Sequence, residues 1–181
     1  MRLVVKSQSI VFERIFKLWT LFINSCRRQR MIKHQGGCHC GKFSIKVELD
    51  PLIVTLCHCI KCRRLTGAVV SNCFYEMSEV QFEGDTLLYD YIGGSGKTVH
   101  TYVCSNCYTI VYRTSDAFSE PEFVAIPVGC FDNPHILPPT IEIFRDYKLK
   151  WLQDDGSIKV RVGDAGYLER IGEMIEQLDH R

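Results

Sequence analysis

The sequence predicts a mainly β protein made of antiparallel sheets, with a helix near its C-terminal end. The first observation is a period-two pattern, in which Phe43, Ile45, Val47 and Leu49 alternate with polar side chains. Such alternation is typical of a strand with one buried face. The second is a series of short runs rich in Val, Ile, Tyr and Phe, separated by Gly, Pro, Asp or Asn. The third is that only two segments favour a helix, so sheets dominate the predicted architecture.

The strand candidates follow one another along the chain with turn residues between them. After residues 43–49, they are residues 52–56, 68–75, 86–92, 98–103, 109–112, 123–128 and 141–144. Between two of them, Gly93-Gly94-Ser95-Gly96-Lys97-Thr98 looks like a phosphate-binding loop. That motif needs a glycine at position 91, where this chain has Tyr91, and a helix after it. A strand pattern follows instead, which predicts a hairpin turn.

The two helix candidates are a short piece at residues 61–65 and a longer one at residues 165–178. In the longer segment, we expect an apolar face formed by Leu168, Ile171, Ile175 and Leu178. Asp164 lies where an N-cap would satisfy the first free amide groups of this helix. The predicted architecture therefore ends in an amphipathic helix.

Length and charge limit the classes of protein to consider. With 181 residues, of which 46% are hydrophobic, the chain can bury one proper core. Residues 1–30 contain seven basic side chains and one acidic side chain, whereas residues 31–181 contain 15 basic and 20 acidic ones. The net charges are +6 and −5. An acidic body has no overall attraction for a phosphate backbone, so we expect no nucleic-acid partner.

The N-terminal segment is hydrophobic as well as basic, but Glu13, Arg14 and Lys17 interrupt it. Its apolar stretches are too short to cross a bilayer, so we expect no transmembrane segment. Three interpretations stay open: an organellar presequence, a helix lying on a surface, and an extension upstream of a start at Met31. We expect a cytoplasmic protein, or a mitochondrial one if residues 1–30 act as a presequence.

Seven of the ten cysteines form three clusters, namely Cys38-x-Cys40, Cys57-x-Cys59-x-x-Cys62 and Cys104-x-x-Cys107. Without a secretory signal, clustered cysteines in a reducing compartment are typical metal ligands. Thiolates in short pairs favour zinc, and two pairs can complete one tetrahedral site. The sequence therefore predicts two zinc ions per chain, one held by the two pairs and one by the triplet.

The fourth partner of the triplet decides what this second site can do. Cys73, Cys130, His58 or an acidic side chain could complete the coordination and make the site structural. If the position stays open, a coordinated external thiol loses its proton to the metal and becomes a nucleophile at neutral pH. The residues alone leave both alternatives open.

The segments GGCHCGKFSIKV, CHCIKCRRLTGA and CSNC, in this order, resemble the glutathione-dependent formaldehyde-activating enzyme family, also called the centromere protein V family. The resemblance implies a β fold with zinc knuckles similar to that of methionine sulfoxide reductase B. It further implies that Cys38, Cys40, Cys104 and Cys107 bind a structural zinc and that Cys57, Cys59 and Cys62 bind a catalytic one. It covers about residues 34–150, which predicts a zinc-binding domain there, a basic amphipathic extension at residues 1–33 and a C-terminal extension with a helix at residues 151–181.

The last knuckle departs from the family pattern at two positions. The family usually has an aromatic residue before the first cysteine and a glycine after the second, where this chain has Val103 and Tyr108. The glycine eases a left-handed turn. We therefore expect strain at Tyr108, with the metal ligands themselves unchanged.

The activity that the resemblance implies is that of a carbon-sulfur lyase, S-(hydroxymethyl)glutathione synthase. Its partners would be glutathione and formaldehyde or a related small aldehyde. The expected contacts for the glutathione carboxylates are basic residues near the triplet and in the glycine-rich loop, namely Lys61, Arg63, Arg64 and Lys97. The main alternative is a non-catalytic interaction module stabilised by two structural zinc ions. A third is a redox or zinc sensor that works through the thiolates of the triplet.

Overall fold

The computed structural model describes residues 31–118, 121–154 and 156–181. The predicted N-terminal extension lies outside the described residues except for its last three, and so does Cys26. Residues Ile32–Arg181 form one compact unit. Among the described helices, none has both the length and the apolar character that a membrane span requires.

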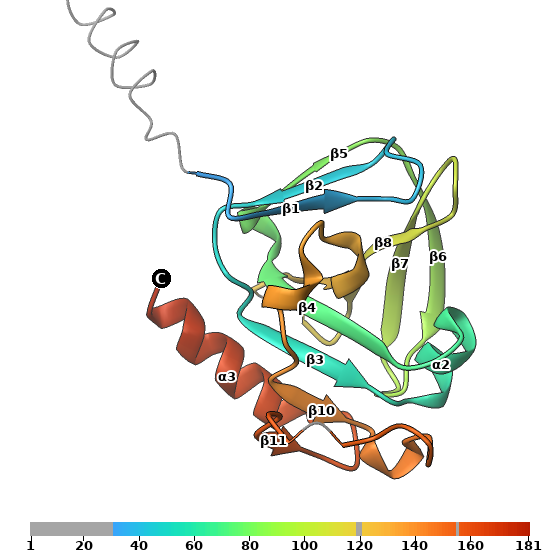
Figure 1. Cartoon of the computed structure of the whole chain (residues 1–181), viewed down its shortest axis with the longest axis vertical. Helices are drawn as coiled ribbons and strands as arrows, with labels where there is room; N and C mark the ends of the chain where they lie inside the picture. Colours follow the sequence, from blue (N-terminus) through green and yellow to red (C-terminus); the bar gives the residue numbers. More distant parts are fainter. Residues whose placement is uncertain (1–30, 119–120, 155) are drawn as a thin grey trace, which may run out of the picture. The chain divides into compact units, whose positions relative to one another are not determined.

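The described unit is mainly β, as the sequence predicts (Figure 1). The helices are α2 (Ile60–Thr66) and α3 (Tyr167–Asp179), with short 3-10 turns between strands. The strands are β1 (His34–Gly37), β2 (Ser44–Val47), β3 (Ile53–Cys57), β4 (Val70–Glu76), β5 (Val80–Glu83), β6 (Thr86–Ile92), β7 (Thr98–Cys104), β8 (Ile110–Ser115), β9 (Phe123–Pro127), β10 (Ile141–Ile143) and β11 (Val160–Arg161).

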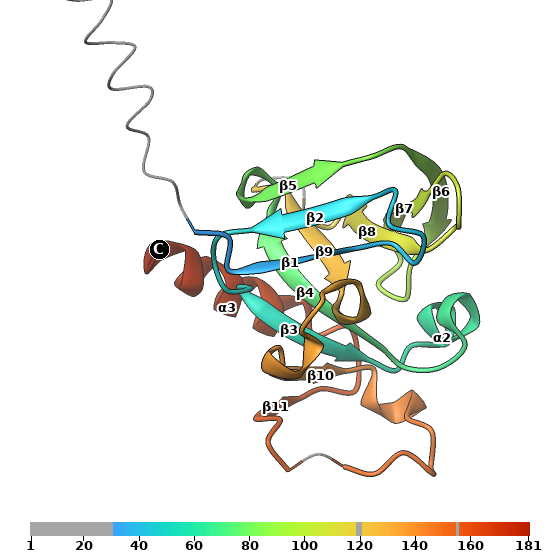
Figure 2. The same ribbon diagram turned by 45° about the horizontal axis from the view of Figure 1, so that its top comes forward.

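The strands form two sheets. The small sheet has the order β1-β2-β5, and the large sheet has the order β11-β10-β3-β4-β9-β8-β7-β6 (Figures 1 and 2). Neighbouring strands are antiparallel except at one edge, where β10 runs parallel to both β3 and β11. The predicted antiparallel architecture is confirmed, with two parallel pairs added where the chain returns to β3 after a long connection.

The two faces of the large sheet pack against two different cores. On β4, Cys73 and Tyr75 pack with Phe43, Ile45 and Val47 in a core shared with the small sheet. These three residues are almost fully buried, which confirms the predicted alternation of the first strand. The opposite face of β4 presents Phe74 to a second core, which includes Ile53, Ala125 and Met174 of α3. The small sheet thus covers one face, and α3 covers part of the other.

Helix α3 matches the predicted segment to within two residues at each end, but its buried face differs from the expected one. Ile171 and Leu178 contact the second core, whereas Leu168 is 80% exposed and Ile175 is 45% exposed. The buried positions are Met174 and Arg170. The helix turns toward them because the Arg170 guanidinium stacks over Phe118 and Phe74, with 5.1 and 5.8 Å from its carbon to the ring centroids.

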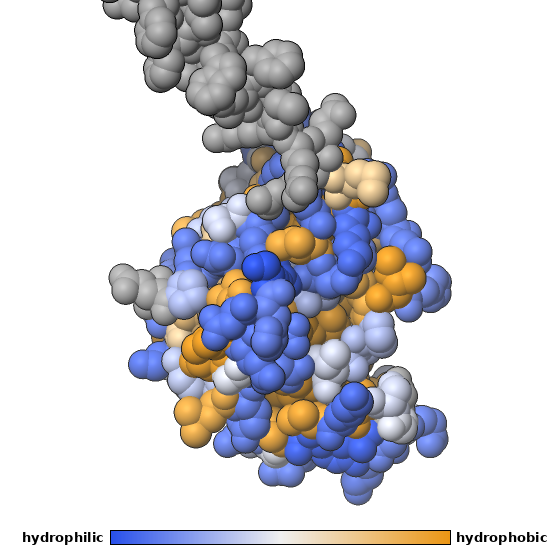
Figure 3. Space-filling view, turned by 90° about the vertical axis from the view of Figure 1, so that its left-hand side faces the viewer, coloured by the Kyte–Doolittle hydropathy of each residue, from blue (hydrophilic) through white to orange (hydrophobic). Residues whose placement is uncertain are grey.

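Hydrophilic residues predominate on the surface seen in Figure 3, with small separate hydrophobic areas.

The predicted cap of α3 is also wrong in position. Gly166, at a φ of 54°, is the N-cap, and its amide donates to the Asp164 carboxylate at 2.9 Å. Asp164 therefore stabilises the turn before the helix.

Strands β1, β5 and β11 were not predicted. In β1, Gly36 forms a bridge with Phe131, and a Cβ atom on Gly36 would lie 1.9 Å from the Cys130 carbonyl oxygen. Glycine in this strand therefore permits a close backbone approach, which sequence patterns read as a loop signal.

Candidate functional site

The two predicted cysteine pairs come together at one edge of the first core. Cys38 and Cys40 lie in the turn between β1 and β2, and Cys104 and Cys107 belong to the end of β7 and the turn after it. The four sulfur atoms all lie within 4.8 Å of one another, and the Cys40 and Cys104 sulfurs are 3.8 Å apart. Four thiolates around one zinc ion at a Zn–S distance of about 2.3 Å would be separated by about 3.8 Å. The donor set therefore fits a four-sulfur metal site.

Neighbouring polar groups stabilise negative charge on two of these sulfurs, those of Cys38 and Cys107. The Phe43 amide donates to the Cys38 sulfur at 3.3 Å. Hydrogen bonds with the side chain and backbone of Thr109 lower the pKa of Cys107 to about 5. The cluster is thus prepared to hold thiolates, which are the form that binds metal.

The turn after Cys107 adopts the left-handed conformation that the sequence analysis expected there. Tyr108 has a φ of 59°, its amide donates to the Cys104 carbonyl at 3.0 Å, and its side chain is 68% exposed. We expect the Tyr108→Gly substitution to raise the free energy of unfolding by about 1 kcal/mol, because glycine relieves the left-handed strain. Denaturant titration measures this change. Ser105→Gly, in the same turn but without a positive φ, is the control and should not stabilise; equal effects would contradict the argument.

The triplet lies on the other face of the large sheet. Cys57 ends β3, and Cys59 and Cys62 belong to the start of α2. Cys59 is the N-cap of this helix, and its sulfur accepts a hydrogen bond from the Cys62 amide at 3.2 Å. Gly67, at a φ of 91°, ends the helix, and its amide donates to the Arg63 carbonyl. A helix short enough to begin and end within the CHCIKCRRLTG segment thus places three sulfurs within 4.8 Å of one another.

Charge in the triplet concentrates on Cys59. Hydrogen bonds from the Cys57 and Cys62 thiols lower the pKa of Cys59 to about 3, and the same interactions raise the pKa of Cys57. The three side chains therefore form one strongly interacting donor group.

The side chains that could complete this group lie elsewhere. In residues 31–118, 121–154 and 156–181, no further His, Cys, Asp or Glu offers a donor atom within 4.8 Å of all three sulfurs. Cys73 points into the first core, on the opposite face of β4, and the Cys130 thiol donates to the Ile110 carbonyl at 3.2 Å. The His58 ring contacts Glu142 at 2.8 Å. The triplet thus offers three protein donors within the described part of the chain.

A buried network fixes the turn that carries the triplet. Besides His58, the Glu142 carboxylate accepts hydrogen bonds from Arg145 at 2.6 Å and Arg161 at 3.1 Å, and Lys148 lies 3.3 Å away. Burial raises the pKa of Glu142, but the hydrogen bonds from His58 and Lys148 outweigh this effect and hold the pKa below its usual range. The stability that the carboxylate contributes is complete above its usual pKa and is lost as the pH falls through the lowered one.

We expect the Glu142→Gln substitution to lower the free energy of unfolding by about 3 kcal/mol at neutral pH, because it leaves several cations without their shared buried partner. Thermal or denaturant unfolding measures the loss. Asp154→Asn is a matched control, since Asp154 contacts the same Arg145 and Lys148 but is exposed. Its expected cost is below about 1 kcal/mol. Equal costs for the two substitutions would contradict the assigned role of Glu142.

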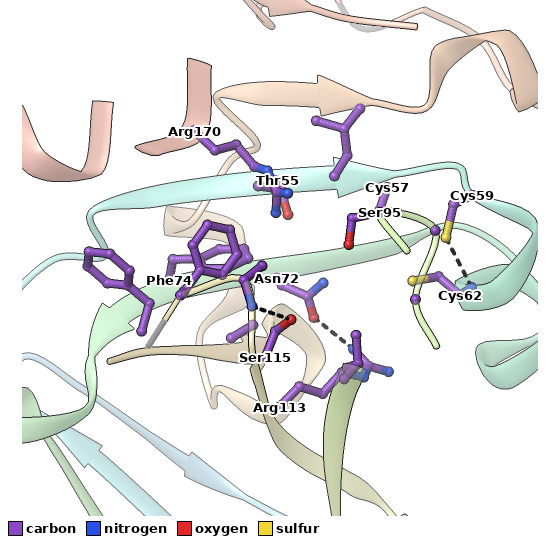
Figure 4. A pocket seen from close by; sticks show the side chains of 18 of the residues that line it. Thr55, Cys57, Cys59, Cys62, Asn72, Phe74, Ser95, Arg113, Ser115 and Arg170 are labelled. Carbon is purple, nitrogen blue, oxygen red and sulfur yellow. Dashed lines mark hydrogen bonds between the residues drawn. The ribbon is translucent and has the colours of Figure 1, made fainter. Parts of the chain in front are cut away.

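A pocket of about 100 Å³ adjoins the triplet (Figure 4). Cys59 and Cys62 lie at one side of it, Thr55, Asn72 and Ser115 point toward its middle, and aromatic side chains close the other parts. The glycine-rich segment is a hairpin turn between β6 and β7, as predicted, and it contributes Gly93, Gly94 and Ser95 to the wall. A Cβ atom on Gly94 would lie 2.8 Å from the Phe144 ring, so the missing side chain lets the hairpin approach the triplet.

Two buried arginines line the same pocket, and the sequence analysis missed both. Arg113 of β8 is 5% exposed, and Arg170 of α3 is 7% exposed. Burial lowers the pKa of Arg170. No acidic residue is present among the described residues that line the pocket. Arg113 stands between Tyr112 and Thr114 in a strand and faces inward. A basic residue at such a position is the sequence signal that could have indicated a buried cation.

The predicted basic contacts lie outside this pocket. Lys61, Arg64 and Lys97 are exposed, and the Arg63 guanidinium donates to the Tyr147 carbonyl at 3.1 Å. None of these four described residues belongs to the pocket lining. The predicted basic residues were chosen from their positions in the sequence. Arg113 and Arg170 are distant from the triplet in sequence and come close to it only in the folded structure.

Comparison with known proteins gives the chain its family. A model of the glutathione-dependent formaldehyde-activating enzymes matches residues 33–147, which include all seven clustered cysteines. No curated protein shows a significant match. Among solved structures, the crystal structure of a Rhodobacter sphaeroides protein shares 22% sequence identity and gives a TM-score of 0.42, over 71% of this chain and 98% of that one. The matched segment spans more than half of the sequence, and the chain belongs to the glutathione-dependent formaldehyde-activating enzyme family.

Proposed function

We propose that both cysteine clusters hold zinc and that the triplet forms a carbon-sulfur lyase site, which joins glutathione to formaldehyde or a related small aldehyde. The observation that carries this proposal is a group of three sulfur donors, with no fourth among the described residues, beside a pocket. The family supports glutathione and formaldehyde as the reacting molecules. The activity would be that of an S-(hydroxymethyl)glutathione synthase.

In this proposal the two clusters have separate roles. Cys38, Cys40, Cys104 and Cys107 would hold a structural ion that joins the β1–β2 turn to the end of β7. Cys57, Cys59 and Cys62 would hold an ion that lowers the pKa of an incoming thiol. The nine described cysteines are free thiols, which supports a reducing compartment, and we propose the cytoplasm.

The chain's own residues would place the reactants. The Glu142 network holds His58, and with it the turn between Cys57 and Cys59. Phe74, Phe118 and Phe144 give the pocket apolar walls. The glutathione thiol gives its proton to water, its sulfur attacks the carbonyl carbon, and the carbonyl electron pair moves to oxygen. This oxygen then takes a proton from water, so the adduct contains all the atoms of the thiol and the aldehyde. Lys61, Arg63, Arg64 and Lys97 stay proposed contacts for the glutathione carboxylates at the outer surface.

Metal analysis and NMR exchange spectroscopy test the proposal. We expect two zinc ions per chain, one of which a mild chelator removes first. The protein with both ions should accelerate the interconversion of glutathione, formaldehyde and their adduct, and the protein with one ion should not. If the protein with both ions leaves the exchange rate at the value in buffer, the lyase proposal is wrong and an interaction module becomes the better hypothesis.

A further inference from the structure

We propose that the pocket beside the triplet binds a carboxylate through Arg113, so that the carbonyl substrate is a small oxo acid, an aldehyde that carries its own carboxylate. This inference rests on the proposed function for its reaction, but the binding site itself is argued from the pocket alone. Formaldehyde has a carbonyl oxygen but no carboxylate that could pair with a guanidinium.

The first observation is the state of the Arg113 guanidinium. It is 5% exposed, and Nη1 donates to the Asn72 side-chain oxygen at 3.1 Å. Nε and Nη2 are buried and have no hydrogen-bond partner in the described structure. Arginine keeps its charge in proteins, and buried donors without partners are costly. A ligand that supplies the missing acceptors would explain why the protein keeps Arg113 buried with these donors unpaired.

The second observation is the geometry of those two nitrogens. Nε and Nη2 form one edge of the planar guanidinium, which is the edge that matches the two oxygens of a carboxylate. The Asn72 bond to Nη1 uses the other part of the group and fixes its plane. The register places Arg113 opposite Ala125 of β9, whose methyl side chain leaves space beside the guanidinium.

The third observation is the charge of the surroundings. Arg113 and Arg170 both line the pocket, and no lining residue among those described is acidic. Arg170 already stacks on Phe118 and Phe74, and its Nε donates to the Gly166 carbonyl at 3.4 Å. Arg113 therefore is the residue whose buried donors lack partners, and Arg170 adds positive potential from α3. Both groups favour an anion over a neutral aldehyde.

The fourth observation is the size of the pocket. A volume of about 100 Å³ can hold several water molecules, at about 10–15 Å³ for each by the same measure. That space suits a molecule of a few heavy atoms, such as glyoxylate, and it is too small to enclose glutathione. Phe74, Phe118 and Ala125 give the pocket apolar walls, and Arg113 next to Asn72 offers the carboxylate a charged place to bind. The carbonyl carbon of such a molecule can then face the triplet across the pocket.

The reaction balances without another reagent. The thiol loses its proton to water, its sulfur forms a bond to the aldehyde carbon, and the carbonyl electron pair moves to oxygen. This oxygen then takes a proton from water, which gives a hydroxy thioether that carries the carboxylate. No oxidation or reduction occurs, and the Arg113 contact is unchanged from substrate to adduct.

The first test measures binding alone, in the zinc-loaded protein without thiol. Glycolate serves as an unreactive carboxylate of the same size, and ethylene glycol as its neutral counterpart. By calorimetric titration, we expect glycolate to bind and ethylene glycol not to bind, with affinity for glycolate lowered at least roughly 10-fold by Arg113→Gln. Arg113→Lys, which keeps the charge but lacks the fork, should lose affinity too. Arg181→Gln, which removes a guanidinium that pairs with Glu79 and does not line the pocket, is the control and should bind as the native protein does. Circular dichroism and zinc content establish that each variant is folded.

The second test distinguishes the possible sources of the carboxylate by pairing two aldehydes with two thiols. Glyoxylate and acetaldehyde are each combined with glutathione and with 2-mercaptoethanol. We expect the native protein to favour glyoxylate at least roughly 10-fold with either thiol, and Arg113→Gln to abolish this preference. A preference that follows glutathione and ignores the aldehyde would overturn the proposal in favour of a glutathione carboxylate. Equal losses in all four combinations would overturn it in favour of a counter-ion for the cysteine triplet.

The two proposals fail separately. If the protein accelerates no addition of a thiol to an aldehyde but glycolate binds through Arg113, the lyase function is wrong and the anion site stands. If addition is accelerated but glycolate does not bind, the anion site is wrong and the lyase function stands.

Discussion

The Cys104→Ser variant is expected to lose the cooperative thermal unfolding of the native protein. Cys104 is 1% exposed and belongs to the first core, and its sulfur lies among the four donors that join the β1–β2 turn to the end of β7. A structural zinc ion contributes on the order of 10 kcal/mol to folding in small zinc domains, which equals the whole stability of a typical domain. Melting curves by circular dichroism, together with zinc content, measure the effect.

Cys73→Ala is the matched control for this prediction. Cys73 is equally buried in the same core but lies outside both sulfur clusters. It should lose about 1–2 kcal/mol and keep its zinc. A Cys104→Ser variant that melts as cooperatively as the control would show that the four-sulfur cluster has no structural role.

The second large effect is expected for Cys59→Ser in the triplet. This substitution should lower the rate of adduct formation at least about 100-fold while the fold is retained, because a serine oxygen is a poor ligand for zinc at neutral pH. NMR exchange rates and the melting temperature, measured on the same sample, separate catalysis from stability. The expected metal content falls from two zinc ions to one.

Cys130→Ser serves as the control, because its hydroxyl can still donate to the Ile110 carbonyl and Cys130 is not a member of either sulfur cluster among the described residues. It should keep both the rate and the metal content. If Cys59→Ser reacts within a factor of about 3 of the native protein, the triplet is not the reactive site.

Much of the fold could be predicted because its strands carry local signals. The alternation at Phe43, Ile45 and Val47 identified β2, and turn residues separated most strands of the large sheet. Strand β1 was missed because its glycines serve a contact with the Cys130–Phe131 backbone, which is distant in the chain. The phase of α3 was missed because Arg170, a charged residue, is buried through its contact with two aromatic rings. In both cases a tertiary contact overrode the local pattern.

The candidate site also has one part that could be predicted from the sequence and one part that could not. The cysteines could be grouped from spacing, because short Cys-x-Cys and Cys-x-x-Cys segments place sulfurs close together whatever follows. The pocket could not be predicted, since Asn72, Arg113 and Arg170 come from β4, β8 and α3 and meet only through strand register and helix packing. The basic residues chosen from the sequence, Arg63 and Arg64, were selected because they adjoin the cysteines in the chain. Neighbours in sequence and neighbours in the pocket are different sets here.

The separation of the two cysteine clusters between opposite faces of the large sheet has an evolutionary consequence. One group belongs to the core beneath the small sheet, and the other to the core beneath α3. Substitutions far apart without shared partners change stability independently. A lineage can therefore exchange residues around the triplet, and so acquire a new reaction or lose the old one, while the scaffold continues to fold.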